Sequence, residues 1–407
     1  MPQANGQEMI LEGVTVLDLT QYLAGAGVTR MMAELGADII KVELPGEGDG
    51  SRLLPVVKDG RSAWFVQHNR GKKSLCVDWN TPDGLQIIKD LVPLVDVVTE
   101  NTGTPDILEK RGLDYASLSK LNPELIMASV SAFGRDSVYS HKTGYDFIAQ
   151  AFSGLMHMTG DPDGPPQFVG SAIADTGSAV HGFAALGYAL FHKERTGRGQ
   201  YIDIAMIDCM FHMHEGHLEC AHLGDYEPIR MGNHHELVFP VGTFKGPEGW
   251  IVVLALDRQW PNFCKAIDRP DLIDDPRYAA MEDRAACRHE LVALTEAWMN
   301  TFDTDAEVIA RLESERVPCS PVLSPLDAIG HEYFEHRDMV RWVEDPVLGK
   351  IPIPGYPFKF GGQPELPDLT APLLGQHNSE ILGSHLGMTD ERIAQLTAAG
   401  VLTVGTT

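Results

Sequence analysis

The sequence predicts an α/β protein whose larger part is built on a parallel sheet. Two apolar strands, at residues 14–19 (VTVLDL) and 38–43 (DIIKVE), flank a helix at residues 29–35 (TRMMAEL). A strand, a helix and a second strand in this order favour a parallel sheet with a right-handed crossover. The pattern recurs between residues 74 and 131. The length of 407 residues, with 43% hydrophobic and 22% charged residues, allows two or three domains.

The first of these units contains a glycine-bearing turn. Residues Ala24–Gly27 (AGAG) separate the first strand from the helix, and Gly36 stops the helix. The pattern GxGxxG is not present in full, so a dinucleotide-binding fingerprint is not supported. The turn still stands at the carboxyl end of a strand, where open α/β sheets bind their ligands.

The second unit repeats the arrangement. We expect strands at Ser74–Val77, Val95–Glu100 and Leu125–Ser131, and a helix at Thr81–Leu91 that a Thr-Pro-Asp-Gly cap opens. The loops that follow the strands of both units are the candidate ligand-binding loops. They are residues 21–27, 44–49, 101–105 and 132–135.

The middle of the chain is mainly helical. Residues 145–193 predict helices, and small residues within Ala179–Phe191 predict close packing against a neighbour. Residues 196–200 (TGRGQ) predict a turn before a strand at Tyr201–Ala205, and Asp208–Leu223 predicts a further helix.

The character of the sequence changes near residue 225, where we expect a second, small α/β domain covering residues 225–325. Its elements are two strands, a helix and two further helical stretches, at Phe239–Thr243, Trp250–Leu256, Trp260–Ile267, 284–300 and 304–314. After it, the proline- and glycine-rich stretch Pro352–Pro367 predicts an extended strap, and Asp390–Ala399 a short helix.

Charge and cysteine content exclude several classes of partner. Asp and Glu number 57 against 32 Lys and Arg, for a formal charge of −25, and such a surface repels nucleic acid and anionic membranes. The six cysteines form no CxxC pair, which favours reduced thiols in a cytoplasmic protein. The first residues (MPQANGQEM) have neither the cationic start nor the apolar region of a signal peptide. No apolar run reaches the ~18 residues of a membrane span.

Asp175 is the first candidate for chemistry. It follows the segment Gly170–Ala174 and opens a helix. An Asp at an N-cap accepts backbone N–H groups at the positive end of the helix dipole, and position alone favours this interpretation. The alternative is a fixed, ionised carboxylate that acts as a nucleophile or a base.

Other motifs also have two interpretations. Tyr145 and Asp146 precede a helix. Tyr145 is either a core aromatic residue and Asp146 a helix cap, or both belong to a functional site. The loop Gly232–His235 is a turn or a flap over an active site. The histidines between His212 and His217 suggest a metal, but an HxH pair points to opposite faces of a helix and no HExxH spacing occurs. Because no G-x-S-x-G elbow is present either, a serine hydrolase has little support.

Taken in order along the chain, the segments resemble the class III CoA-transferase family (the CaiB/BaiF family, with formyl-CoA and carnitine CoA-transferases). The resemblance covers about residues 10–402. It rests on LEGVTVLDLTQYLAGAGVTRMMAELGADIIKVE, NRGKKSLCVDW, GYDFIAQAFSGLMHMTGDPDGPP, GSAIADTGSAVHGFAALGYALFHKERTGRGQYIDIAM, GNHHELVFPVGTFKGPEGWIVVLALDRQWPNFC, VPCSPVLSPLDAI and GQHNSEILGSHLG.

The resemblance implies an architecture. Each subunit has a large Rossmann-like domain with a parallel sheet and a small α/β domain, and two subunits interlock as a homodimer. The large domain is discontinuous. For this chain it implies a first segment of the large domain at residues 1–224, the small domain at 225–325, and a C-terminal segment at 326–407 that returns to the large domain.

The resemblance also implies the chemistry. Asp175 matches the family's catalytic Asp, in an alignment anchored by residues 160–166 (GDPDGPP) and 196–200 (TGRGQ). Its carboxylate attacks an acyl-CoA to give a mixed anhydride and CoA thiolate, and CoA passes to a free carboxylic acid. No metal and no permanently bound cofactor are implied, since coenzyme A and acyl-CoA are substrates. The Gly232–Leu237 loop is the candidate lid that keeps water from the anhydride.

The CoA contacts implied by the resemblance come from several loops. The family often has Gln where this chain has Leu23, a formyl-CoA transferase has Arg in place of Leu44, and Lys110 stands for a phosphate-binding Arg after one extra residue. The full set of implied contacts is Tyr22, Leu23, Leu44, His68, Asn69, Arg70, Gly71, Asn101, Thr102, Gly103, Lys110, Tyr145 and Asp146.

Two alternatives to a CoA-transferase remain at this point. An α-methylacyl-CoA racemase shares the fold but uses a His in a Gly-His-Asp motif, and this chain has Tyr145 there. Tyrosine, with a pKa near ~10, is a poor base at neutral pH. A metal-dependent hydrolase built on His214 and His217 is the alternative of another class. The sequence leaves the acyl-CoA donor and the acceptor acid open.

Overall fold

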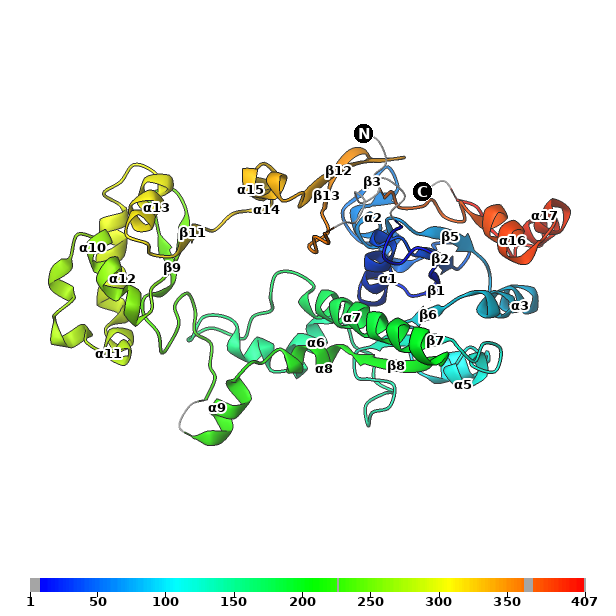
Figure 1. Cartoon of the computed structure of the whole chain (residues 1–407), viewed down its shortest axis with the longest axis horizontal. Coiled ribbons are helices and arrows are strands. Elements are labelled where there is room, and N and C mark those ends of the chain that lie inside the picture. Colours follow the sequence, from blue (N-terminus) through cyan, green and yellow to red (C-terminus); the bar gives the residue numbers. More distant parts are fainter. Residues whose placement is uncertain (1–7, 225–226, 362–368, 406–407) are drawn as a thin grey trace. The chain divides into compact units, whose positions relative to one another are not determined.

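The computed structural model describes residues 8–224, 227–361 and 369–405, which form two compact units (Figure 1). The large unit consists of Met1–Leu155, Val169–Gly216 and Glu335–Thr407, and the small unit of Met156–Phe168 and His217–Phe334. These bounds differ from the expected domain limits at residues 224 and 325, most clearly because residues 156–168 group with the small unit. The domain limits themselves stay a prediction.

The large unit is built on a six-stranded parallel sheet, as the sequence predicts. Its strand order is β5-β2-β1-β6-β7-β8, and every neighbouring pair is parallel. In the central register, Val16 of β1 lies between Ile39 of β2 and Val97 of β6. The strands are β1 (Thr15–Leu19), β2 (Asp38–Glu43), β5 (Lys73–Cys76), β6 (Val97–Glu100), β7 (Ile126–Ser131) and β8 (Gln200–Ala205).

One face of this sheet is covered by the helices α1 (Ala24–Glu34) and α7 (Ile173–Thr196). The expected turn at Ala24–Gly27 is wrong, because α1 already begins at Ala24. The glycines serve close packing instead. A Cβ on Gly27 would lie 2.9 Å from the Ala179 Cβ of α7, and a Cβ on Gly25 would lie 2.6 Å from the Thr20 Cγ2.

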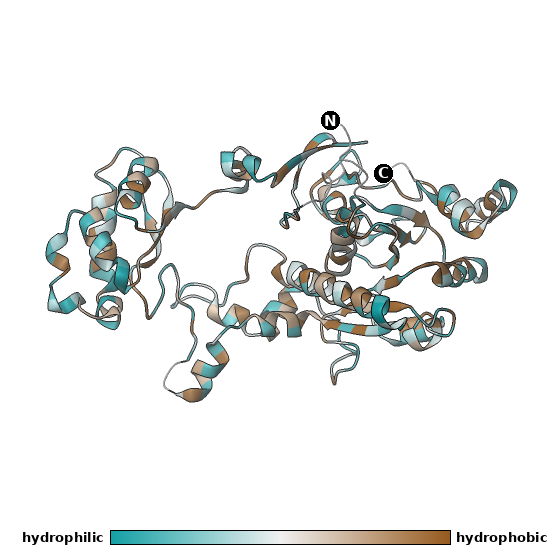
Figure 2. Ribbon diagram, viewed as in Figure 1, coloured by the Kyte–Doolittle hydropathy of each residue, from teal (hydrophilic) through white to brown (hydrophobic). Residues whose placement is uncertain are grey.

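The opposite face is covered by α3 (Pro82–Leu91), α5 (Tyr115–Leu118), α16 (Asn378–Leu386) and α17 (Asp390–Ala398). Ile381 and Leu382 of α16 join the same core as Leu17 and Ile40 of the sheet. The C-terminal segment therefore packs on the large unit. Figure 2 shows the hydrophobic residues concentrated along the sheet strands and mixed with hydrophilic ones along the outer helices.

The small unit has an antiparallel sheet of three strands, β11 (Cys319–Pro321), β10 (Trp250–Leu254) and β9 (Val241–Lys245). A core of Phe244, Ile251 and Phe263 joins this sheet to its helices. These are α10 (Trp260–Ala266), α11 (Met281–Ala286), α12 (Arg288–Met299) and α13 (Asp305–Ser314). The small α/β fold agrees with the expectation, although the helix expected at 284–300 is divided at Cys287.

A second expected helix is also divided. The stretch Asp208–Leu223 contains α8 (Met206–His212) and α9 (His217–Leu223), with Glu215 between them at a φ of 51°. A residue in this left-handed conformation cannot continue a helix. The periodic apolar pattern on both sides gave no sign of the interruption.

The other α-helices and strands are short, and they lie between the elements named so far. They are β3 (Val57–Lys58), β4 (Arg61–Ser62), α2 (Ala63–Asn69), α4 (Asp106–Glu109), α6 (Asp146–Phe152), α14 (Pro325–Ile329), α15 (Glu332–His336), β12 (Val340–Asp345) and β13 (Gly349–Pro354). Of the strap expected at Pro352–Pro367, the first residues belong to β13, and residues 362–367 lie outside the described part of the chain. None of the described helices has the length and hydropathy that crossing a membrane requires.

Candidate active site

Asp175 lies in the first turn of α7, as the third residue of that helix. The expected N-cap role is wrong, because the helix begins two residues earlier and its N-cap is Ala172. The Ala172 side chain cannot accept a hydrogen bond, so the N-terminal N–H groups of α7 need another partner.

That partner is Asp146, which is the first residue of α6. The Asp146 Oδ1 accepts hydrogen bonds from the backbone N–H groups of Ala174 at 2.7 Å and Asp175 at 3.1 Å. Asp146 therefore caps α7, whereas the sequence suggested that it caps the helix it opens. No local pattern could have predicted this contact, because it joins residues 28 and 29 positions apart.

Gln150 extends the contact to a second point. It is fully buried, and its Nε2 donates to the other Asp146 oxygen, Oδ2, at 2.6 Å. Its Oε1 accepts from the backbone N–H of Val169 at 2.9 Å. The segment Val169–Asp175 is thus bonded to α6 at both ends, and Gln150 is not among the residues predicted for the site.

The electrostatics of Asp175 differ from those expected of a permanently ionised carboxylate. Burial raises the pKa of Asp175 to about 7, and the negative charge of Asp146 adds to this. A helix N-terminus favours an anion, but Asp146 already occupies two of its N–H groups. Within the described residues, no cation or hydrogen-bond donor is recorded against the Asp175 carboxyl. Near neutral pH the group is therefore poised between its two forms.

Two tyrosines are connected to Asp146, Tyr145 as its neighbour in the chain and Tyr22 through a ring contact with Tyr145. Tyr145 is the N-cap residue of α6 and is 64% exposed, and its ring meets the Tyr22 ring edge-on at a centroid distance of 6.4 Å. Tyr22 adopts a φ of 59°, and its N–H donates to the Asp49 Oδ1 at 3.0 Å. Four of the residues predicted for the site, Tyr22, Tyr145, Asp146 and Asp175, are linked in this way.

Other predicted CoA contacts have structural partners. Leu23 is nearly buried as the N-cap residue of α1, and Leu44 packs partly against the core. Arg70 is fully buried, with its guanidinium on Glu34 at 2.5 Å. Asn69 accepts from the Lys72 Nζ at 2.9 Å.

Of the residues beside Asn69 and Arg70, His68 is buried and Gly71 is partly buried. Burial lowers the pKa of His68 to about 4. Gly71, at a φ of 78°, donates its N–H to the Thr370 carbonyl. The CoA contacts of residues 68–71 stay a prediction.

The loop after β6 is held by its neighbours. The Asn101 side chain exchanges two hydrogen bonds of 2.7 Å with the backbone of Gln21, which joins the first and third candidate loops. The carbonyls of Thr102 and Gly103 accept from the Arg135 guanidinium, which also pairs with Glu100. Lys110 lies at the end of α4, largely exposed, and pairs with Asp106 at 2.5 Å.

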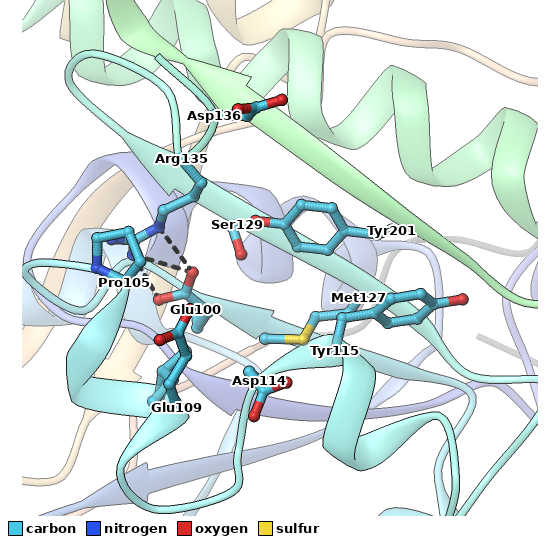
Figure 3. Close-up of a pocket in the computed structure, with 11 residues that line it drawn as sticks. Glu100, Pro105, Glu109, Asp114, Tyr115, Met127, Ser129, Arg135, Asp136 and Tyr201 are labelled. Carbon is cyan, nitrogen blue, oxygen red and sulfur yellow. Dashed lines mark hydrogen bonds and ion pairs between the residues drawn. The ribbon is translucent and has the colours of Figure 1, made fainter. Parts of the chain in front are cut away.

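Beside the Arg135–Glu100 pair lies a pocket of about 250 Å³ (Figure 3). Carboxyl groups and the rings of Tyr115 and Tyr201, which contact each other at an interplanar angle of 31°, surround it, and Asp175 is not among its lining residues. The pocket is lined by Glu100, Pro105, Leu108, Glu109, Asp114, Tyr115, Met127, Ser129, Arg135, Asp136 and Tyr201.

A network of buried charges lies beneath the first two candidate loops. Asp18 pairs with Lys72 at 2.9 Å, Lys41 with Asp49 at 2.7 Å, and Glu43 with Arg52 at 2.7 Å. Burial raises the pKa of Asp18, but Lys72 and Lys41 outweigh it and lower this pKa to about 2. Lys41 also donates to the Thr20 carbonyl, so the network fixes the backbone that leads to Tyr22.

The histidines do not gather into a metal centre. His214 contacts the Ser153 carbonyl through Nε2 at 2.5 Å, and His181 packs edge-on against His212. In the ranges that the structure describes, no group of three metal-ligating side chains is close enough to hold an ion. In the Gly232–Leu237 loop, His234 forms an isolated bridge to Gly242, and its role as a lid stays a prediction.

Comparison with known proteins places these features in a family. Residues 11–378 match the model of CoA-transferase family III. The chain is 34% identical to succinyl-CoA:glutarate CoA-transferase of Mus musculus, over 98% of this chain and 92% of the relative. It is 37% identical to succinyl-CoA:mesaconate CoA-transferase of Haloarcula hispanica, over 91% and 95%. A CaiB/BaiF family protein from Brucella suis superposes with a TM-score of 0.83 at 33% identity, covering 93% of this chain and all of that one.

Proposed function

Because the chain belongs to CoA-transferase family III and transfers CoA from an acyl-CoA to a carboxylic acid, we propose that Asp175 is the nucleophile of that transfer. One observation carries the proposal. Asp175 is a half-buried carboxyl group whose only recorded charged neighbour, among the described residues, is a second carboxyl group. A carboxylate without a cationic partner keeps its electron pairs available for attack, and perturbed groups of this kind gather at functional sites.

The proposed first half-reaction forms an enzyme-bound thioester. An Asp175 oxygen attacks the thioester carbon of the donor, the C–S bond breaks, and CoA leaves as a thiolate. The thiolate then attacks the Asp175 carbonyl carbon of the mixed anhydride. The C–O bond to the donor's acyl group breaks, the donor acid leaves as a carboxylate, and CoA remains as a thioester on Asp175.

The second half-reaction runs the same steps with the acceptor. The acceptor carboxylate attacks the Asp175 thioester, and CoA leaves as a thiolate while a new anhydride forms. The thiolate attacks the acceptor's acyl carbon, which gives the new acyl-CoA and frees the Asp175 carboxylate. Each step exchanges one acyl bond for another, so no ATP is required, and oriented groups replace bimolecular encounters.

The fixed loops support the proposed position of the CoA chain. Tyr22 and Tyr145 are exposed and their rings contact each other, Tyr145 precedes Asp146 in the chain, and Asn101 joins the loop after β6 to Gln21. We assign the pantetheine arm to this exposed tyrosine surface and the phosphates to the exposed end of α4, where Lys110 lies. With a net charge of −25, the chain repels the negatively charged CoA, and a local cation at that place offsets the repulsion.

The names of the relatives support a substrate class. Two of them are named for succinyl-CoA as donor and for glutarate or mesaconate as acceptor, at 34% and 37% identity. We therefore propose succinyl-CoA as the donor and a dicarboxylic acid of four to six carbons, on the order of succinate in size, as the acceptor.

The proposal includes a homodimer in the cytoplasm. On α7, Val180 is 50%, Tyr188 76% and Phe191 61% exposed. These residues lie on one face of the helix, since their spacings of eight, eleven and three positions match helical periodicity. An apolar face of this kind fits a subunit interface. All six cysteines are free, which suits a reducing compartment.

A mass-spectrometric transfer assay tests the function. The protein is incubated with succinyl-CoA and a panel of dicarboxylic acids, with Asp175→Ala in parallel. New CoA thioesters should appear with the natural protein and be absent with the variant. Transfer that persists in Asp175→Ala would contradict the assignment of the nucleophile. Deuterium exchange at the α-carbon of a branched acyl-CoA, without transfer, would point to a racemase.

A further inference from the structure

Asp146 and Gln150 connect α6 to the helix that carries Asp175. The Gln150 amide bridges the Asp146 carboxylate and the Val169 N–H, and Asp146 bridges Gln150 and the N-terminus of α7. Both residues are more than nine-tenths buried, with exposures of 7% for Asp146 and 0% for Gln150. Water cannot readily replace a lost hydrogen bond at either side chain, so breaking one of these bonds costs free energy.

From this geometry we infer that Gln150 is a positioning residue for the CoA-transferase reaction, which aims Asp175 by orienting the Asp146 carboxylate against the first turn of α7. The inference rests on the proposed role of Asp175 as nucleophile. It assigns no contact with substrate to Gln150, which is enclosed within the large unit.

The direction of each hydrogen bond fixes the orientation of Asp146. The Gln150 amide has an NH2 group that only donates and a carbonyl oxygen that only accepts, and the Val169 N–H occupies the carbonyl oxygen. The Nε2 group is then the part of the amide that faces Asp146, and it donates a hydrogen bond to the Asp146 Oδ2 at 2.6 Å. The remaining oxygen, Oδ1, is thereby turned toward the N–H groups of Ala174 and Asp175.

The consequence for catalysis is geometric. An attacking oxygen must meet the thioester carbon at about 3–3.5 Å with the correct angle, and an error of about 1 Å costs roughly 100-fold in rate. Asp175 has no recorded side-chain hydrogen bond within the described residues, so its aim depends on the backbone of its helical turn. That backbone is fixed by Asp146, and Asp146 by Gln150.

A pair of substitutions that moves the negative charge from residue 146 to residue 150 tests the inference. Asp146→Asn places an amide donor against the Gln150 donor, and Gln150→Glu places a carboxylate against the Asp146 carboxylate, so each single variant breaks the bond between the two residues. In the double variant D146N/Q150E the new amide donates to the new carboxylate, whose second oxygen accepts from Val169. The hydrogen bond between residues 146 and 150 is then restored with its direction reversed, and the bonds from the backbone N–H groups of Val169, Ala174 and Asp175 keep theirs.

We expect each single variant to lose kcat by about 10- to 100-fold, with KM for succinyl-CoA within about twofold, and the double variant to regain most of that loss. Recovery of kcat in the double variant would show that residues 146 and 150 act through their mutual hydrogen bond. If the two substitutions acted independently, their losses of kcat would multiply. The rate of forming the covalent enzyme–CoA adduct, followed by intact-protein mass spectrometry, should fall and recover with kcat.

Thr81→Ala is the matched control for a purely structural effect. Thr81 caps α3 through its side chain, which accepts from the Gly84 N–H at 3.1 Å, also within the large unit. Its loss should lower the melting temperature without lowering kcat. Gln150→Met, which has nearly the same length and no hydrogen-bonding groups, should lower kcat even at temperatures where the protein is fully folded.

The outcomes separate the two proposals. A double variant no more active than the poorer single variant would overturn the positioning role, as would a change in KM with kcat unaltered. If Asp175→Ala transfers CoA and forms the adduct as the natural protein does, the nucleophile is misassigned, whatever the coupling shows. If Asp175→Ala is inactive and the coupling is absent, only the positioning role fails.

Discussion

The large unit contains two groups of buried charges that are built in opposite ways. Beneath the first candidate loops, Asp18, Lys41, Asp49 and Lys72 form ion pairs, and the pKa of Asp18 falls to about 2 although burial opposes this. At the start of α7, Asp175 faces another carboxyl group, and burial together with that charge raises its pKa to about 7.

The contrast separates charges that stabilise the fold from the carboxyl group that we propose as the nucleophile. A paired buried ion has its electron pairs committed to partners, and removing one partner leaves the other uncompensated. Among the residues that the structure describes, no cation compensates the Asp175 charge, so ionising this group in the folded protein costs free energy. The two groups should therefore respond to substitution with opposite signs.

The largest effect should come from breaking the paired group. Lys72→Met leaves the fully buried Asp18 without the ammonium at 2.9 Å, and we expect the free energy of unfolding to fall by about 3–5 kcal/mol. Urea denaturation followed by circular dichroism measures it. Lys73→Met is the adjacent control: its ammonium is one-third exposed between Asp38 and Glu380, so its loss should cost about 0–1 kcal/mol. Equal losses in the two variants would mean that the buried Asp18–Lys72 pair stabilises the fold no more than an exposed pair.

Asp175→Asn should act in the opposite direction. An unfolded Asp has a pKa near 3.9, so a folded pKa of about 7 penalises folding fully above pH 7, and the penalty disappears as the pH falls toward 4. After discounting for partial exposure, we expect the variant to be about 1–2 kcal/mol more stable than the natural protein at pH 8, and less so at pH 5. Both values come from urea denaturation at the two pH values.

Asp83 supplies the control for this stabilisation. It is an exposed carboxylate in the first turn of α3, where the helix N-terminus favours a negative charge. Asp83→Asn should therefore destabilise slightly, by about 0.3–1 kcal/mol. If both substitutions destabilise to the same extent, Asp175 is an ordinary favourable helix anion, and its site is not strained.

The pH dependence of the first half-reaction should follow the protonation of Asp175. Protonation removes the attacking electron pair, so the rate of adduct formation should decrease about tenfold per pH unit below a midpoint near 7. Rapid-quench measurements with succinyl-CoA between pH 5 and 9 give this midpoint without interference from the acceptor acid. A midpoint near 4 would mean that a cation reaches Asp175 in the working enzyme and that the contrast with the paired network does not hold.

The sequence predicted the parallel sheet of the large unit better than the site around Asp175. All six strands of the large unit lie within two residues of their expected bounds. The central strands β1, β2, β6 and β7 are buried almost throughout and have largely apolar sequences, whereas β8 alternates between exposed and less exposed residues. The AGAG segment was misread as a turn because glycine is a turn signal, whereas here it allows α1 to approach Ala179 closely.

The site could be predicted only in part, for a physical reason. The family resemblance singled out Asp175 and Asp146, but not the hydrogen bonds between α6 and α7, because side-chain contacts between residues far apart in the chain leave no periodic pattern. The left-handed conformation of Glu215, which divides the helix expected at 208–223, also has no sequence pattern that predicts it. The raised pKa of Asp175 depends on burial and on Asp146, and both arise only when the fold assembles.

The smallest effect on stability should come from the exposed end of α4, where Lys110→Met removes an ion pair to Asp106 that lies in solvent. We expect a change of only about 0–0.5 kcal/mol in the free energy of unfolding, because screening and side-chain entropy offset such pairs. If Lys110 binds CoA phosphates, KM for succinyl-CoA should nevertheless rise several-fold, with kcat unchanged, and the rise should vanish at high salt.

Lys120→Met is the control for this last prediction, since Lys120 is an exposed lysine that follows α5 and has no predicted contact with CoA. It should leave both KM and stability unchanged. A KM that is equally insensitive to Lys110→Met would remove this cation from the phosphate site. The acidic chain would then have to bind the polyanion with backbone N–H groups or with Arg111, whose guanidinium is engaged by Asn80 and the Ile107 carbonyl in the structure.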